Sequence, residues 1–479
     1  MSAPNCLRCL VRPSASSVPR AAPSLPPLAA LSWTAPFSTT AARDAAPKAG
    51  GDSRGGHIRA GKKLQLGKFK KDKVVDRGKA PLPGERKAYR KRITLSNDNA
   101  IPVPWLNDLA PGDMADPANV AKILALPAEV QDQLRAIEAF KPTQCWGMFS
   151  KPSVLVRNET VDLASRMQAS VEKKQTLRLV LTGDKVTGKS LMLLQAMAHA
   201  FLNEWIVIHL PEAQELTTAC TEYAPIPNTD PVQYMQPVYV LKLIQAIKRA
   251  NEKVLSKTYT VSAHPELPQN IGANTPLLSL LNAAKEPDAA WPVFQAFWYE
   301  LTAQNANRPP ILFSLDGLAH IMKMSDYRSP AYDLIHSQDL ALVRLFTETL
   351  GGSVKFPAGG AVLAATSRNN APRVPSMELS LAQREAEQAK ATDPTVEIPQ
   401  KDPFFRGYDE RSEAVLKSVQ VLRLRGVSKL EARSLMEYWA ASGMLRATVD
   451  EKTVTEKWAL AGSGVLGEME RAALLTMRI

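Results

Sequence analysis

The chain of 479 residues is poor in cysteine and has no long apolar run. Its four cysteines are Cys6, Cys9, Cys145 and Cys220, which are too few and too scattered for a disulfide framework or a repeated zinc-ligand pattern. Prolines or charged residues interrupt every apolar stretch before it reaches the roughly 18 residues of a membrane helix. We therefore expect a soluble protein without a membrane span, and we assign the CxxC of Cys6 and Cys9 no redox or metal-binding role.

Acidic residues are missing from the first 43 positions. Residues 1–43 contain four arginines among many serines, alanines and prolines, but no Asp or Glu. This composition is typical of an organellar transit peptide, which is cleaved after import. Three prolines break the stretch 25–37, which otherwise resembles the apolar region of a secretory signal. The sequence thus predicts a transit peptide over residues 1–43 and a mitochondrial location.

Positive charge is concentrated in one segment. Residues 54–92 carry 15 Lys or Arg and three acidic residues, a net charge of +12 that equals the net charge of the whole chain. Such a segment cannot bury a core of its own, so we predict a disordered basic extension over residues 44–99. Basic blocks of this kind commonly bind nucleic acid, where each neutralised phosphate releases counterions. The predicted contacts are Lys62, Lys63, Lys68, Lys70, Lys71, Arg90, Lys91 and Arg92.

The partner of this extension is predicted to be RNA, because the chain contains no helix-turn-helix or zinc-finger pattern for sequence-specific DNA binding. The alternative is a solvated linker whose charge only keeps the protein soluble.

Short apolar strands alternate with helical patterns in the remaining chain. Strands are predicted at 177–182, 205–210, 311–315 and 361–365, and helices at 190–202 and 232–254. Continuously apolar strands are typical of a parallel sheet that is covered on both faces. The alternation predicts a three-layer α/β domain over residues 100–375.

The C-terminal part has a different pattern. Residues 376–401 are rich in Glu, Gln, Ala and Pro, and we predict a helix that leads into a linker. Helical periodicity over 409–423, 428–442 and 467–477 predicts a small, mostly helical domain at 402–479.

The first predicted strand leads directly into a phosphate-binding motif. The segment from Gly183 to Ser190 fits the P-loop pattern GxxxxGK[ST] and lies between a predicted strand and a predicted helix. Its backbone N–H groups and the helix N-terminus would bind phosphates. Lys189 is expected at the β and γ phosphates and the Ser190 hydroxyl on Mg²⁺. The predicted nucleotide-binding residues are Gly183, Asp184, Lys185, Val186, Thr187, Gly188, Lys189, Ser190 and Leu191.

A second magnesium ligand is expected at the end of a neighbouring strand. Asp316 follows the apolar run 311–315 and is predicted to hold Mg²⁺ with Ser190. The alternative is a turn residue, because Asp-Gly is a common turn pair. The next residue is Gly317, where active ATPases of this type usually have a glutamate, so the sequence offers no obvious general base and predicts slow or absent hydrolysis.

Three polar residues follow the last predicted strand. Thr366, Ser367 and Asn369 come after the apolar run 361–365. They are candidates for sensing the γ-phosphate, and ordinary turn residues are an equal alternative. The base is not determined, because the guanine-specific Asn-Lys-x-Asp tetrapeptide is missing. The expected cofactors are therefore GTP or GDP, or ATP or ADP, together with Mg²⁺.

Several of these segments resemble a known family. The segments 179–195, 205–211, 427–433 and 437–443 are similar to the mitochondrial small-subunit ribosomal proteins of the death-associated protein three family, and the resemblance covers about residues 140–479. It implies an AAA-like P-loop NTPase domain in the head of the small ribosomal subunit and a bound purine nucleotide with a structural role. It further implies contacts with the small-subunit rRNA and neighbouring ribosomal proteins, and we expect no homo-oligomer.

The chain departs from the family pattern at two places. Val186 stands where relatives often have Gly, and the segment Gly462–Gly467 stands where a segment ending in Pro-Arg is expected. An arginine that senses the γ-phosphate is therefore in doubt. The leading hypothesis is a structural ribosomal component that holds a nucleotide; the alternative is an active mitochondrial AAA-like NTPase that acts as a switch or remodelling enzyme on nucleic acid.

Overall fold

The structure is a computed structural model that describes residues 93–304, 308–367 and 371–475. The predicted transit peptide, the eight predicted nucleic-acid contacts, Cys6, Cys9 and Asn369 lie outside the described residues.

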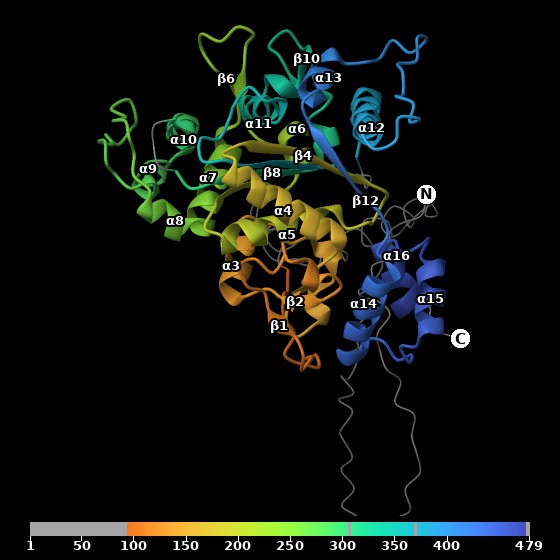
Figure 1. The fold of residues 1–479 in the computed structure, drawn as a ribbon. Helices are drawn as coiled ribbons and strands as arrows, with labels where there is room; N and C mark the ends of the chain where they lie inside the picture. Colours follow the sequence, from red (N-terminus) through yellow and green to blue (C-terminus); the bar gives the residue numbers. More distant parts are fainter. Residues whose placement is uncertain (1–92, 305–307, 368–370, 476–479) are drawn as a thin grey trace, which may run out of the picture. The chain divides into compact units, whose positions relative to one another are not determined.

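A parallel sheet forms the centre of the described chain (Figure 1). Its strand order is β12-β4-β11-β8-β5, and each neighbouring pair is parallel. Strand β11 therefore lies between β4, which leads into the P-loop motif, and β8, which ends at Asp316. The carboxyl ends of all these strands lie at one edge, where open α/β sheets bind their ligands. The strands are β4 (Thr176–Gly183), β5 (Ile206–Leu210), β8 (Ile311–Asp316), β11 (Gly360–Ala365) and β12 (Gln420–Leu424).

Helices cover both faces of the sheet, which confirms the predicted α/β architecture. On one face lie α3 (Ala128–Ala136), α4 (Asn158–Glu172) and α5 (Lys189–Leu202); on the other lie α7 (Pro237–Ala250), α10 (Pro287–Thr302) and α11 (Ala341–Gly351). Successive side chains of a strand point to opposite faces. Leu179 and Leu181 of β4 accordingly enter the core beneath α4 and α5, whereas Val180 enters the core beneath α7 and α10. The strands β5, β8 and β11 are buried along their whole length.

One secondary-structure prediction is wrong. Residues 409–423 were expected to be helical throughout, but only α13 (Glu410–Leu416) is a helix, and β12 follows it. Strand β12 pairs with β4 at the edge of the central sheet, with Val421 opposite Val180. A five-residue strand with two adjacent buried residues is too short for periodicity to distinguish it from a helix. Helix α12 (Pro375–Lys390) opens the predicted helix-linker segment 376–401, and residues 391–401 after it contain no helix or strand.

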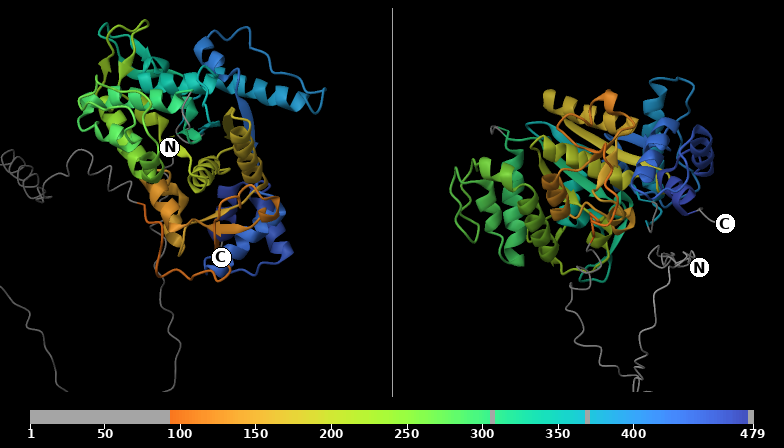
Figure 2. Two further views of the ribbon diagram at one scale, coloured as in Figure 1. Left: turned by 60° about the vertical axis from the view of Figure 1, so that its left-hand side comes forward. Right: turned by 90° about the horizontal axis from the view of Figure 1, so that it is seen from below.

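Helices form at the predicted segments 428–442 and 467–477, and a further helix over residues 451–460 was not predicted; all of them share a separate core. They are α14 (Lys429–Ala441), α15 (Glu451–Leu460), α16 (Leu466–Glu470) and the π-helix η7 (Arg471–Leu475). Trp439, Val454 and Met469 pack together in this core with Val103 and Ile123 from the N-terminal part of the described chain. The left view of Figure 2 shows these helices beside the N-terminal strands.

Those N-terminal strands were not predicted. They are β1 (Asn107–Asp108), β2 (Ile123–Ala125) and β3 (Ser153–Leu155), with β1 parallel and β3 antiparallel to β2.

The remaining described elements are short. They are α6 (Ala213–Thr217), β6 (Ala224–Pro225), β7 (Tyr234–Met235), α8 (Glu252–Lys257), α9 (Leu277–Asn282), β9 (Met324–Arg328) and β10 (Leu334–His336), with the single 3-10 turns η2 (Pro117–Asn119), η3 (Pro142–Gln144), η4 (Trp146–Met148), η5 (Leu318–His320) and η6 (Ser337–Asp339). Among the described residues, no helix has the length and apolar character to cross a membrane.

Candidate nucleotide-binding site

The P-loop motif forms the connection between β4 and α5. Strand β4 ends at Gly183 and helix α5 begins at Lys189. Gly183 has φ +142°, and a Cβ atom on it would lie 2.6 Å from the carbonyl oxygen of Leu424 in β12. Val186 has φ +56°, so the loop keeps a left-handed conformation at the position where relatives often have Gly, at a cost of roughly 1 kcal/mol.

Lys189 and Ser190 lie at the start of α5. The buried Lys189 ammonium donates hydrogen bonds to the carbonyl oxygens of Gly183 (3.0 Å) and Asp184. Ser190 Oγ donates to Asp316 Oδ2 at the end of β8, at 2.8 Å. The structure thus brings together the two side chains that the sequence analysis paired, although they are 126 positions apart.

Ser190 and Asp316 fit a magnesium ion. Both offer the oxygen ligands that Mg²⁺ prefers, and adjacent oxygens of an octahedral Mg²⁺ lie roughly 3 Å apart, close to the 2.8 Å between Ser190 Oγ and Asp316 Oδ2. Within the described ranges, no three His, Cys, Asp or Glu residues gather at metal-binding distance. An ion held here would take its other oxygens from phosphates and water, as Mg²⁺ commonly does at nucleotide sites.

A lysine that the sequence analysis missed lies beside this pair. Lys141 Nζ is 3.3 Å from Asp316 Oδ2 and donates a hydrogen bond to the carbonyl oxygen of Pro211, which follows β5. Burial and the Lys141 charge lower the pKa of His209 in β5 to about 3, so its imidazole is neutral at physiological pH. Lys141 precedes the P-loop by more than 40 residues and belongs to no motif, so nothing in its sequence context marks it.

The backbone accounts for the glycine beside Asp316. Gly317 has φ +93°, and a Cβ atom on it would lie 3.3 Å from Cδ2 of His320 and 3.6 Å from Cβ of Ala213. Residues other than glycine rarely adopt this backbone conformation. A catalytic glutamate at position 317 would therefore need a different backbone.

The residues after β11 are partly engaged in the sheet. The Thr366 hydroxyl donates to the carbonyl oxygen of Leu181 in β4 at 3.1 Å, and the Thr366 N–H donates to the same oxygen at 3.0 Å. These bonds favour the interpretation of Thr366 as a strand-end residue over a γ-phosphate sensor. Ser367 is half-buried, and its predicted role stays a prediction.

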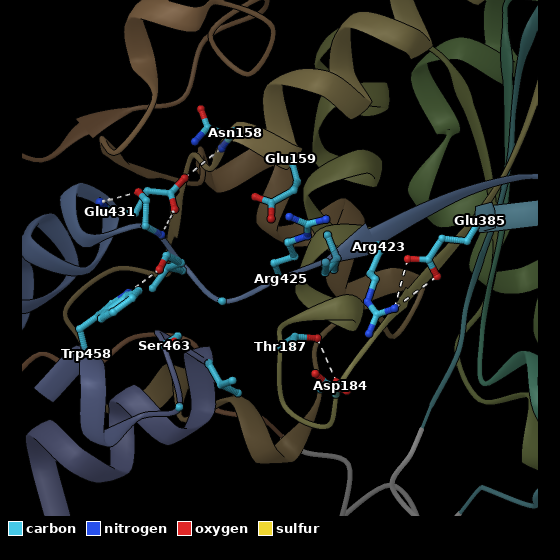
Figure 3. A pocket seen from close by; sticks show the side chains of 16 residues that line it. Asn158, Glu159, Asp184, Thr187, Glu385, Arg423, Arg425, Glu431, Trp458 and Ser463 are labelled. Atoms are coloured by element: carbon cyan, nitrogen blue, oxygen red, sulfur yellow. Dashed lines mark hydrogen bonds and ion pairs between the residues drawn. The ribbon is translucent and has the colours of Figure 1, made fainter. Parts of the chain in front are cut away.

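A cleft of about 670 Å³ lies beside the P-loop (Figure 3). Its walls come from the P-loop, the N-terminus of α4, the connection from β12 to α14, and the loop before α16. The cleft has the size of small-molecule sites in general. Residues with charged or hydroxyl side chains include Glu159, Asp184, Thr187, Arg423, Arg425 and Ser463.

Arg157 holds one wall of this cleft against the P-loop. Its guanidinium is buried and donates to the carbonyl oxygens of Thr187 (3.0 Å) and Arg425 (2.7 Å) and to Glu159 Oε1 (3.0 Å). One side chain therefore fixes the P-loop, the end of β12 and the start of α4 relative to each other.

Glu431 joins the N-termini of α4 and α14 by hydrogen bonds. Its buried carboxylate accepts from the backbone N–H of Asn158 at the start of α4 (3.0 Å) and of Ser428 at the start of α14 (2.7 Å). Ser428 Oγ in turn accepts from the Glu431 N–H, which completes a capping box.

The segment Gly462–Gly467 touches the P-loop through its backbone. The Gly467 N–H donates to the carbonyl oxygen of Val186 at 3.0 Å. The C-terminal helices therefore reach the P-loop motif by a main-chain contact at the place where the sequence analysis expected a segment ending in Pro-Arg.

Together, the parallel sheet, the loop between β4 and α5 and the Ser190–Asp316 pair define an α/β protein with a strand-to-helix loop at the carboxyl edge of its sheet. The model of the mitochondrial ribosomal death-associated protein 3 family matches residues 154–472. A protein of Neurospora crassa named small ribosomal subunit protein mS29 is 60% identical over the full length of both chains. A Schizosaccharomyces pombe protein of the same name is 23% identical over 77% of each chain. The chain belongs to this family, which confirms the resemblance found in the sequence and the predicted mitochondrial location.

Proposed function

We propose that this protein is a structural component of the mitochondrial small ribosomal subunit, in its head region, and that it holds a purine nucleotide through the P-loop with slow or no hydrolysis. The observation that carries the ribosomal part is the 60% identity, along both full chains, to a small ribosomal subunit protein. The basic extension before residue 93 is proposed to contact the rRNA.

The nucleotide part is supported by the geometry of the loop. Lys189 and the N-terminus of α5 provide positive charge at the loop, Ser190 and Asp316 fit Mg²⁺, and the adjacent cleft has room for a base and ribose. The cleft lies between the α/β domain and the C-terminal helices, so a nucleotide in it would join the two parts.

Slow hydrolysis is supported by position 317. Phosphoryl transfer to water needs a group that orients the water, and the left-handed backbone at Gly317 disfavours a glutamate there. An active NTPase is the alternative, and rapid turnover of ATP or GTP by the purified chain would establish it.

Two measurements test the proposal. In a sucrose gradient of mitochondrial lysate, the protein should sediment with the small ribosomal subunit; sedimentation as a free protein contradicts the ribosomal role. Mass spectrometry of the denatured, purified protein should recover about one nucleotide per chain and identify its base. Lys189→Ala should abolish this recovery, whereas Lys257→Ala, at an exposed surface position, should not. Equal recovery from all three proteins contradicts P-loop binding.

A further inference from the structure

Lys141 contacts the same oxygen that accepts the Ser190 hydrogen bond. Its Nζ lies 3.3 Å from Asp316 Oδ2, and Ser190 Oγ lies 2.8 Å from that atom. The side chains of Lys141 and Asp316 are only 17% and 10% exposed. Because salt screens buried charges much less than exposed ones, the ammonium provides a lasting positive charge next to the predicted magnesium ligands.

The backbone of Lys141 is also held in place by the turn that carries it. The Lys141 N–H donates to Gln144 Oε1 at 2.8 Å, and the Trp146 indole N–H donates to the same oxygen at 2.8 Å. Phe140 is buried and packs edge-to-face against Trp146, with ring centroids 5.3 Å apart. The backbone that carries this lysine is therefore ordered on folding rather than on ligand binding.

On the basis of the proposed nucleotide binding, we infer that Lys141 is a built-in cation that replaces magnesium in neutralising the bound phosphates. A lysine ammonium forms charge-assisted hydrogen bonds with phosphate oxygens, and Lys141 is placed where a P-loop protein otherwise needs the metal's charge. The nucleotide is consequently retained with or without Mg²⁺.

The same geometry weakens magnesium binding. An ion on Asp316 Oδ2 would lie at most about 5.5 Å from the Lys141 ammonium, since Mg²⁺–oxygen distances are about 2.1 Å. Two positive charges at this separation repel each other strongly in a partly buried site. Asp316 is also already paired by Lys141, so less of its negative charge remains for the metal.

The test compares nucleotide affinity in excess Mg²⁺ and in excess EDTA. Fluorescent analogues of GDP and ADP are titrated into the purified full chain, and the analogue that binds is used throughout. The wild type should bind with affinities that agree within about threefold in the two buffers. Lys141→Met should lose more than about tenfold in EDTA and regain affinity with Mg²⁺, because the metal then supplies the missing charge.

Lys242→Met is the matched control. Lys242 lies on α7 and pairs with Glu138 and Glu215 instead of Asp316, so its removal changes the net charge equally but should leave the wild-type ratio of the two affinities. Thermal unfolding of each variant, measured without nucleotide, shows whether it is folded.

Each other outcome overturns a distinct claim. Wild-type binding that disappears in EDTA overturns the role of Lys141 and leaves the nucleotide site intact. A Lys141→Met variant that binds equally less well in both buffers and unfolds at a lower temperature shows a purely structural ion pair. Wild-type protein that binds neither analogue in either buffer overturns the proposed nucleotide function itself.

Discussion

Replacing Arg157, which directly precedes α4, by methionine should destabilise the protein far more than replacing an arginine on the surface of that helix. Methionine keeps most of the apolar stem but removes the donors to the carbonyl oxygens of Thr187 and Arg425 and to Glu159. Each of these two carbonyls left without a donor costs about 1 kcal/mol, and the loss of the ion pair with Glu159 adds a similar amount. We therefore expect a loss of about 3 kcal/mol in the free energy of unfolding.

Urea unfolding followed by tryptophan fluorescence measures this loss in nucleotide-free protein. The control is Arg166→Met. Arg166 lies on α4, the helix that Arg157 precedes, and pairs with Asp162 at 2.8 Å, but both side chains are substantially exposed, at 37% and 42%. Exposed pairs of this kind contribute at most about 0.5 kcal/mol. If the two variants differ by less than about 1 kcal/mol, Arg157 does not hold the P-loop to β12, and the reasoning is refuted.

Two further substitutions test the packing around the sheet. Gly183→Ala should lower the free energy of unfolding by about 2 kcal/mol, because the positive φ of Gly183 and the close Leu424 carbonyl leave no room for a Cβ atom. The control is Gly272→Ala, which has open space around it and should cost less than about 0.5 kcal/mol in the same urea assay. Equal costs contradict the steric argument. Glu300→Gln should cost about 3 kcal/mol, since it leaves Arg308 buried without its counter-ion, whereas Glu348→Gln should change little because its ion pair is exposed. Burial raises the pKa of Glu300. Hydrogen bonds from Val261, Ser262 and His264 and the charge of Arg308 together lower this pKa by more than burial raises it, so the net shift is downward from 4.5. The stability that Glu300 contributes is therefore complete above about pH 4.5 and is lost on further acidification; a wild-type advantage over Glu300→Gln that persists unchanged at lower pH contradicts this assignment.

The sequence predicts the centre of the fold well, because its signals there are local and strong. The strands around Leu179, Ile208 and Phe313 are mostly apolar, and each is followed by a helix or a polar turn. The pairing of Ser190 with Asp316 also follows from local rules, since parallel strands end at a common edge. Their predicted roles in nucleotide and metal binding are separate from this placement and depend on the experiments above.

The sequence could not predict the residues that join distant segments. Lys141 and Arg157 are single basic residues without a motif, and their importance comes from contacts with Asp316, Thr187 and Arg425. Strand β12 could not be predicted for the same reason, because its five residues form a strand only by pairing with β4. Contacts with residues distant in the sequence determine the structure at these positions, and a local sequence pattern does not reveal such contacts.

The position of the cleft links nucleotide binding to stability. Arg157 and Glu431 hold the P-loop, β12 and the two helix N-termini that surround it, and a nucleotide in the cleft would join the same segments. A ligand that binds only the folded state stabilises it by about 4 kcal/mol at a thousand times its dissociation constant. This exceeds the expected cost of Arg157→Met, so saturating nucleotide should restore much of the variant's stability. A chain that keeps its nucleotide without magnesium and without rapid hydrolysis would retain this stabilisation continuously, which is what a structural nucleotide requires.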